Sequence, residues 1–150
     1  MRILEEKDIE RYKSFLESHD RCNFQQSLEW GKVKTSWKSE IILAEDDKGN
    51  IIGSLMVWIR KIPIFGNIMY SARGPVCDLY DEEIIKDLRE GADSLAKKYK
   101  AFVLRVEPDI LKSMIDNKIY YLALEKNKNT GKTFVLHDGP PYANGDIHTG

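Results

Sequence analysis

The carboxylate of Glu107 closes an apolar segment, Ala101–Glu107, and Pro108 follows it. A carboxylate at the end of a buried strand can accept a proton or hold an amine, which is the chemistry of a general base. The alternative is structural: Glu107 could form an ion pair with Arg105 or with another cation at the strand end. Both interpretations stay open on the sequence alone.

Two cationic positions could bind an anionic ligand. Lys34 follows a short amphipathic segment, and an ammonium on a flexible stem is suited to phosphate as a point charge. Lys32 and Lys34 could equally be solvated charges on a helix face. Arg73 precedes Gly74 and Pro75, where it could contact an anionic substrate, although an arginine at a strand end is more often structural.

The composition narrows the class of protein. Acidic and basic residues nearly cancel, 24 against 23, so no global basic field is present, no DNA partner is expected and any RNA contact must be local. Cys22 and Cys77 lie far apart in the sequence, which predicts reduced thiols and no metal site. No apolar run approaches the ~20 residues of a membrane span, and the first residues lack a signal peptide, so we expect a cytoplasmic protein.

The elements that must position these residues are helices and strands in mixed order. Apolar residues at helical spacing predict a helix over residues 7–18 and a short helix near residues 28–33. Alternating and β-branched residues predict strands over residues 39–45, 51–60 and 67–72. A segment rich in Asp, Gly and Asn joins the first two strands, which indicates a β-hairpin.

A long helix and a last strand complete the predicted domain. Asp81 is a suitable N-cap for an amphipathic helix that ends near Lys98. Residues 101–107 form a near-continuous apolar run, which is typical of a strand buried inside a sheet, so Val103 and Val106 should be shielded from solvent. The order of elements predicts an α/β (α+β) fold, an acetyltransferase-like (GNAT-like) mixed sheet with flanking helices.

Three blocks of sequence, Phe24–Lys34, Ser71–Val76 and Ala101–Pro108, occur in the order seen in the FemABX family, and the chain resembles that family over residues 1–111. The resemblance implies a peptidoglycan bridge-forming aminoacyltransferase. Such an enzyme takes an amino acid from aminoacyl-tRNA and joins it to the stem-peptide amine of UDP-MurNAc-pentapeptide or of a lipid-linked peptidoglycan precursor.

The resemblance also implies roles for single residues. Lys34 matches the lysine that contacts the diphosphate, and Glu107 matches an acidic residue expected to be catalytic. Arg73, Phe102 and Arg105 are further candidates for substrate binding, although Phe102 replaces a tyrosine of some relatives and lacks its hydroxyl. The family has two acetyltransferase-like halves and this chain has most of one, so we expect an incomplete acceptor site. The glycine-rich acetyl-CoA loop is missing, so no cofactor is expected.

The end of the chain, residues 112–150, resembles isoleucyl-tRNA synthetase. The resemblance rests on the stretch Lys132–His148, where an apolar run enters a Gly/Pro loop. His148, Thr149 and Gly150 then match the first three residues of the family's HIGH tetrad. In that family the loop approaches the aminoacyl-adenylate and the histidines stabilise the ATP phosphates. The resemblance implies that five residues bind ATP and the amino acid: Gly139, Pro140, Pro141, Tyr142 and His148.

We expect this tail to be poorly packed and unable to bind ATP, because the tetrad is incomplete and the phosphate site needs the helix that follows it. The leading interpretation is a fragment of a Fem-type aminoacyltransferase. The alternatives are a fragment of isoleucyl-tRNA synthetase and a non-catalytic module that binds muropeptide or tRNA. The join near Leu111 could reflect a natural fusion, a truncation or a chimeric reading frame.

Overall fold

A computed structural model describes residues 2–33 and 35–110, which fall in the first of two units of the chain, Met1–Ile110. The helices are η1 (Glu6–Asp8), α1 (Ile9–Ser18), η2 (Phe24–Gln26), α2 (Leu28–Val33) and α3 (Glu82–Tyr99). The strands are β1 (Arg2–Ile3), β2 (Lys38–Glu45), β3 (Ile51–Ile62), β4 (Gly66–Ala72), β5 (Val76–Cys77) and β6 (Ala101–Glu107).

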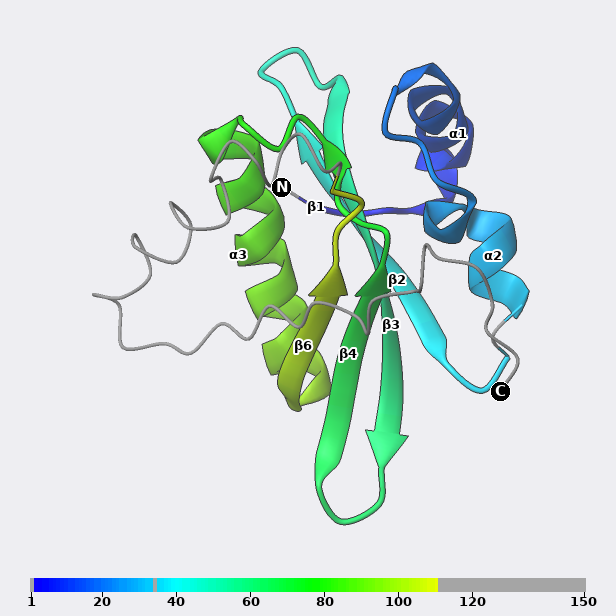
Figure 1. Cartoon of the computed structure of the whole chain (residues 1–150), viewed down its shortest axis with the longest axis vertical. Coiled ribbons are helices and arrows are strands. Elements are labelled where there is room, and N and C mark those ends of the chain that lie inside the picture. The colour runs from blue at the N-terminus through cyan, green and yellow to red at the C-terminus, as the bar shows by residue number, and fades with distance from the viewer. Residues whose placement is uncertain (1, 34, 111–150) are drawn as a thin grey trace, which may run out of the picture. The chain divides into compact units, whose positions relative to one another are not determined.

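The strands form one sheet in the order β1-β2-β3-β4-β6, and β5 pairs with β3 beside that path (Figure 1). Neighbours along the path are antiparallel except β4 and β6, which are parallel. A parallel pair needs a crossover connection, and α3 supplies it. The carboxyl ends of β4 and β6 are therefore brought to the same edge of the sheet.

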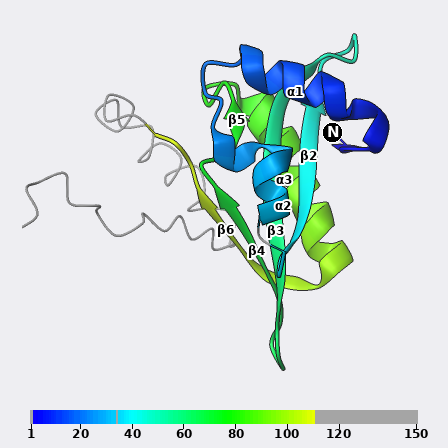
Figure 2. The same cartoon turned by 90° about the vertical axis from the view of Figure 1, so that its right-hand side faces the viewer.

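Both faces of the sheet are covered, by α3 on one side and by α1 and α2 on the other (Figure 2). Because side chains alternate along a strand, β3 contributes Leu55 and Val57 to the α3 side and Met56 and Trp58 to the opposite side. All four side chains are buried. The central hairpin of β2 and β3 therefore belongs to two hydrophobic cores.

Most predicted elements are confirmed. The first helix, the short second helix, the β-hairpin and the third strand all lie where the sequence placed them, within a few residues. The Asp81 carboxylate accepts hydrogen bonds from the backbone amides of Glu83 and Ile84, which confirms the predicted N-cap of α3. Within the described part of the chain, no helix is long and apolar enough to cross a membrane.

The prediction for the last strand is wrong in one respect. Among the described residues β6 pairs only with β4 and forms the edge of the sheet, and Val103 is 41% exposed. Val106 is half-buried and packs against the core under α3. An apolar run looks the same in a central strand and in an edge strand with one covered face, so periodicity could not separate the two.

A β-bulge lies near the start of β6. Asn67 pairs with Ala101 and Ile68 pairs with Val103, which leaves Phe102 without a partner in the ladder. The extra residue places the Phe102 ring at the surface, where it is 60% exposed.

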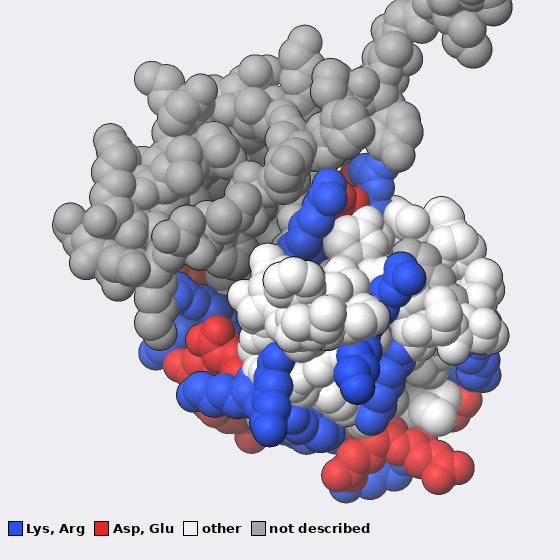
Figure 3. All heavy atoms as spheres, turned by 90° about the horizontal axis from the view of Figure 1, so that it is seen from below, with Lys and Arg blue, Asp and Glu red and all other residues white. Residues whose placement is uncertain are grey.

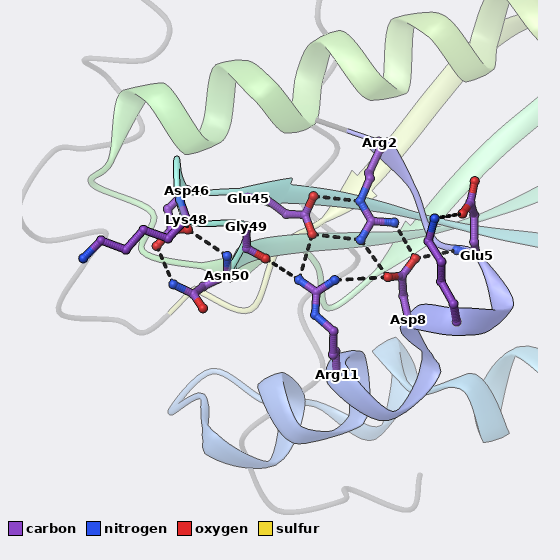
Figure 4. Close-up of polar contacts among 10 residues, drawn as sticks. Arg2, Glu5, Asp8, Arg11, Glu45, Asp46, Lys48, Gly49 and Asn50 are labelled. Atoms are coloured by element: carbon purple, nitrogen blue, oxygen red, sulfur yellow. Dashed lines mark hydrogen bonds and ion pairs between the residues drawn. The ribbon is translucent and has the colours of Figure 1, made fainter.

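A network of ion pairs fastens the first residues of the chain to the central hairpin (Figure 4). The Arg2 guanidinium donates to the carboxylates of Asp8 and Glu45, and Arg11 donates to the same two carboxylates. Hydrogen bonds from Arg2 hold the pKa of Asp8 well below its usual range and lower the pKa of Glu45. The network joins β1, η1 and α1 to the end of β2.

Acid should therefore weaken this attachment. A carboxyl group whose pKa is lowered by folding stabilises the protein above its unfolded pKa, about 4, and this stabilisation is lost as the pH falls through the lowered value. We expect the denaturation midpoint to fall as the pH drops below about 4.

In Glu45→Gln the midpoint should be lower at neutral pH and the acid-induced drop smaller, as measured by urea unfolding across a pH series. Glu10→Gln, which removes only a surface pair with Lys13, is the control. An unchanged acid profile in Glu45→Gln would contradict the assignment.

Candidate active site at the carboxyl ends of β4 and β6

The loops that follow β4 and β6 meet because the two strands are parallel and adjacent. Their register pairs Ala72 with Glu107, so Arg73 and Asp109 leave the sheet side by side. In open sheets with crossover connections, ligands bind beside the carboxyl ends of such strands. The topology itself thus marks this edge as the place for a site.

Glu107 is held by two side chains on the same face of the sheet. The Tyr70 hydroxyl donates to Glu107 Oε2 at 2.5 Å, and Arg105 Nη2 lies 2.6 Å from Glu107 Oε1. Behind Tyr70, the buried Trp58 ring stacks on the tyrosine ring at 6.0 Å between centroids. The Glu107 side chain is 31% exposed, so its carboxylate is fixed in orientation and still faces solvent.

Three charged residues lie at the adjacent loops. Arg73 has a left-handed backbone (φ 53°), and its Nη1 lies 3.0 Å from Asp109 Oδ1. Arg21 donates to the backbone carbonyl of Asp109, although the two residues are 88 positions apart. The contacts anchor the segment after β6 to the loop after β4 and to the loop after α1. Two guanidinium groups thereby bind Asp109, two residues after Glu107.

A buried glutamine supports the site from inside. The Gln26 side chain accepts from the Met56 backbone amide at 2.8 Å and donates to the carbonyl of Ala72. Met56 lies between the parts of β3 that pair with β4 and with β5, so its amide has no ladder partner on that side. The Tyr12 hydroxyl donates to the Gln26 carbonyl at 2.6 Å. Gln26 therefore ties η2 and α1 to the end of β4.

Close packing around Gln26 extends to the loop after β4. A Cβ atom at Gly74 would lie 2.7–2.8 Å from three atoms of the Gln26 amide group. Only a glycine allows the backbone to pass so close to this side chain. The position of Arg73, one residue earlier, depends on that approach.

The structure brings three of the predicted site residues together and separates a fourth. Arg73, Arg105 and Glu107 gather at the carboxyl ends of the parallel pair. Phe102 lies at the opposite end of β6, about 16 Å along the strand from Glu107. The ion pair with Arg105, which the sequence left open for Glu107, is present. Several predicted residues lie outside the described residues: Lys34, Gly139, Pro140, Pro141, Tyr142 and His148.

Four residues of this region were not predicted from the sequence: Tyr70, Asp109, Arg21 and Gln26. Tyr70 opposes Arg105 only because α3 returns the chain parallel to β4, and no local pattern reports that register. Asp109 offered one signal, an acidic residue two positions after Glu107 and just beyond Pro108. Gln26 lies in the block Phe24–Lys34, but no local pattern predicts that it is buried, since glutamine is normally exposed.

The thiols and the acidic residues do not form a metal or nucleophile site in the described ranges. Cys22 is exposed and Cys77 is buried, and neither forms a disulfide. Burial raises the pKa of the Cys77 thiol to about 12, so it is not a thiolate nucleophile. Residues 2–33 and 35–110 contain no group of three or more potential ligands placed to hold a metal ion.

Residues 8–137 match the FemAB family, and the match extends past Leu111. A UDP-N-acetylmuramoylpentapeptide-lysine N(6)-alanyltransferase from Weissella viridescens is 31% identical over 102 residues, which are 68% of this chain and 30% of that protein. The crystal structure of FemX superposes with a TM-score of 0.70 at 23% identity, over 83% of this chain and 31% of that one. The chain thus spans less than a third of the length of these relatives.

Two further similarities concern the fold and a short segment. A ribosomal-protein-alanine N-acetyltransferase from Brucella melitensis shares the fold, with a TM-score of 0.58 at 16% identity over 91% of this chain and 97% of that one. The acetyltransferase-like architecture predicted from the sequence is therefore confirmed. An isoleucine–tRNA ligase from Caldicellulosiruptor bescii is 57% identical over 51 residues, 34% of this chain and 5% of that protein.

Proposed function

Because the chain belongs to the FemAB family, we propose that it is the acetyltransferase-like part of an aminoacyltransferase acting on a peptidoglycan precursor. The donor would be an aminoacyl-tRNA, and the acceptor the stem-peptide amine of UDP-MurNAc-pentapeptide or of a lipid-linked precursor. One observation carries the proposal: the oriented, solvent-facing carboxylate of Glu107 at the carboxyl end of a parallel strand pair. The alanyltransferase of Weissella viridescens supports the choice of substrate class.

The chemistry of the transfer explains why such a carboxylate is needed. The acceptor amine attacks the ester carbon of the aminoacyl-tRNA, the new C–N bond forms, and the ester C–O bond breaks as the ribose oxygen leaves and takes up a proton. The amine must lose a proton in the same process. A carboxylate has about four lone-pair positions, and Tyr70 and Arg105 occupy two of them, which leaves room for the amine. Glu107 would hold the amine and accept its proton.

The cations around Glu107 suit the other end of the acceptor. UDP-MurNAc-pentapeptide carries a diphosphate, and the lipid-linked precursor also carries phosphate. Arg73 and Arg21 stand at the loops beside Glu107, and guanidinium groups bind phosphate oxygens with geometrically directed hydrogen bonds. Lys34, which lies outside the described residues, is the proposed diphosphate contact from the family resemblance.

Binding and transfer should respond to different substitutions. Titration calorimetry with UDP-MurNAc-pentapeptide is expected to show that Lys34→Ala weakens binding by roughly 1–3 kcal/mol, the scale of a lost charge-assisted hydrogen bond. With radiolabelled aminoacyl-tRNA present, Glu107→Gln should lower transfer of label to the muropeptide by about a hundredfold. Affinity for the muropeptide should change much less in Glu107→Gln.

Matched variants serve as controls for the binding measurement and for the transfer measurement. Lys32→Ala removes a neighbouring exposed lysine and should leave the affinity unchanged, and Glu90→Gln removes an exposed carboxylate of α3 and should leave transfer unchanged. Equal affinity in the Lys34→Ala and parent proteins would reject the role of Lys34. Transfer at the parent rate in Glu107→Gln would reject the catalytic assignment.

The same experiments separate the alternatives. Muropeptide binding by the parent without any transfer would support a non-catalytic binding module. The short similarity to isoleucine–tRNA ligases keeps a synthetase-like activity as the second candidate. Adenylate formation from ATP and isoleucine would support that candidate, and its proposed residues are the Gly/Pro loop and His148.

A further inference from the structure

The tip of the β3–β4 hairpin exposes two large apolar side chains. Ile64 is 100% exposed and Phe65 is 74% exposed, and both belong to the turn between Ile62 and Gly66. Ile64 has φ 73°, a backbone conformation that is unfavourable for a β-branched residue. Asn or Gly would fit this turn with less strain, so neither solubility nor turn geometry accounts for isoleucine here.

Basic residues surround the tip. Arg60 and Lys61 are the exposed residues at the end of β3. The carboxyl end of α3 lies beside them, because Asn67 of β4 donates to the Tyr99 carbonyl and the Lys100 carbonyl lies 3.3 Å from the Cβ position of Gly66. That end of the helix adds three exposed lysines, namely Lys97, Lys98 and Lys100.

Figure 3 views the molecule from this end and shows uncharged residues in the centre, with several Lys and Arg side chains and some Asp and Glu side chains around them. The Glu40 carboxylate interacts with this group through contacts with Tyr99, Lys38 and Lys98. Six exposed Lys and Arg residues lie at this end, and Glu40 pairs with two of them, Lys38 and Lys98; the other four are Arg60, Lys61, Lys97 and Lys100. The basic group therefore keeps a strong positive charge.

We infer that this hairpin tip is a docking surface for an anionic lipid bilayer, with Ile64 and Phe65 inserted among the acyl chains and the basic residues against the headgroups. The tip is convex, so its apolar side chains need a medium that deforms around them. A bilayer interface does so, and attracts cations when its lipids are anionic. The long stems of Lys and Arg let their charges reach the headgroups while the tip inserts.

The inference rests on the hairpin and not on the proposed transfer reaction, so the docking surface and the transfer activity can fail separately.

The test uses vesicles of phosphatidylglycerol and phosphatidylcholine in equal parts, without muropeptide or tRNA, and measures co-sedimentation of the full chain. Parent protein should bind these vesicles, and binding to pure phosphatidylcholine vesicles should be at least tenfold weaker. Ile64→Ser combined with Phe65→Ser should weaken binding to the anionic vesicles at least tenfold. Arg60→Gln combined with Lys61→Gln should weaken it by about fivefold for each lost charge.

Surface-matched controls lie on the same domain away from the tip. Tyr80→Ser removes an aromatic side chain that is 59% exposed, and Lys86→Gln with Arg89→Gln removes two exposed cations of α3; both should bind as the parent does. Circular dichroism checks that each variant is folded. Absence of parent binding, or equal losses in tip and control variants, would overturn the inference. The inference would also be overturned if sedimentation showed that the tip joins two copies of the chain and that this association is lost in the Ile64→Ser and Phe65→Ser variant.

Discussion

The Gln26→Leu protein is expected to be about 4 kcal/mol less stable to unfolding than the parent, even though leucine is apolar and similar in size. The substitution leaves the amide of Met56 and the carbonyl of Ala72 buried without the hydrogen bonds that Gln26 now provides. Each such unsatisfied group costs about 1–3 kcal/mol. Urea unfolding followed by far-ultraviolet circular dichroism measures the difference.

The neighbouring residue offers a matched control for this experiment. Gln25 belongs to the same short helix and is half-buried, so Gln25→Leu should change stability by less than about 1 kcal/mol. Gly74→Ala should act on the same contacts as Gln26→Leu, because the new Cβ would displace the Gln26 amide group. If Gln26→Leu unfolds at the same urea concentration as Gln25→Leu, the hydrogen bonds of Gln26 do not stabilise the core.

The Gly53→Ala protein should lose about 3 kcal/mol of stability through overpacking. Gly53 lies on β3 where α3 crosses the sheet, and a Cβ atom there would lie 2.6 Å from Cγ2 of Ile84 and 3.2 Å from Cβ of Cys77. Real Cβ atoms do not approach other carbons so closely, so α3 would have to move away from the sheet. Thermal or urea unfolding of the variant gives the loss.

A double-mutant cycle tests the cause. Ile84→Ala removes the clashing methyl group and on its own should cost about 2–4 kcal/mol through the cavity that it leaves. The double variant should be more stable than the sum of the two single effects predicts, by about 1–2 kcal/mol. Strict additivity would show that Gly53 is not needed for the approach of α3.

Features with a local signal were predictable from the sequence, and features set by long-range pairing were not. Ile84, Leu88 and Leu95 recur at helical spacing after the capping residue Asp81, so α3 could be placed with its buried face. The position of β6 at the sheet edge depends on which strands flank it. The apolar run that contains Val103 does not carry that information.

The candidate site divides in the same way. Glu107 and Arg105 stand on alternate positions of one strand, so their proximity follows from the strand period alone. Tyr70 joins them through the parallel register with β4, which no local pattern encodes. Phe102, assigned to the site through the family resemblance, is moved to the surface by a bulge that the sequence does not reveal.

The hydrogen bond from Arg21 to Asp109 closes a loop of 88 residues around almost the whole described unit. Bringing such distant residues together reduces the conformational entropy of the chain, and the reduction grows with the length of the loop. This entropy is lost during folding and not during ligand binding. A ligand that reaches Glu107, Arg73 and Asp109 therefore meets groups that the fold has already immobilised, and its affinity is not lowered by the need to order them.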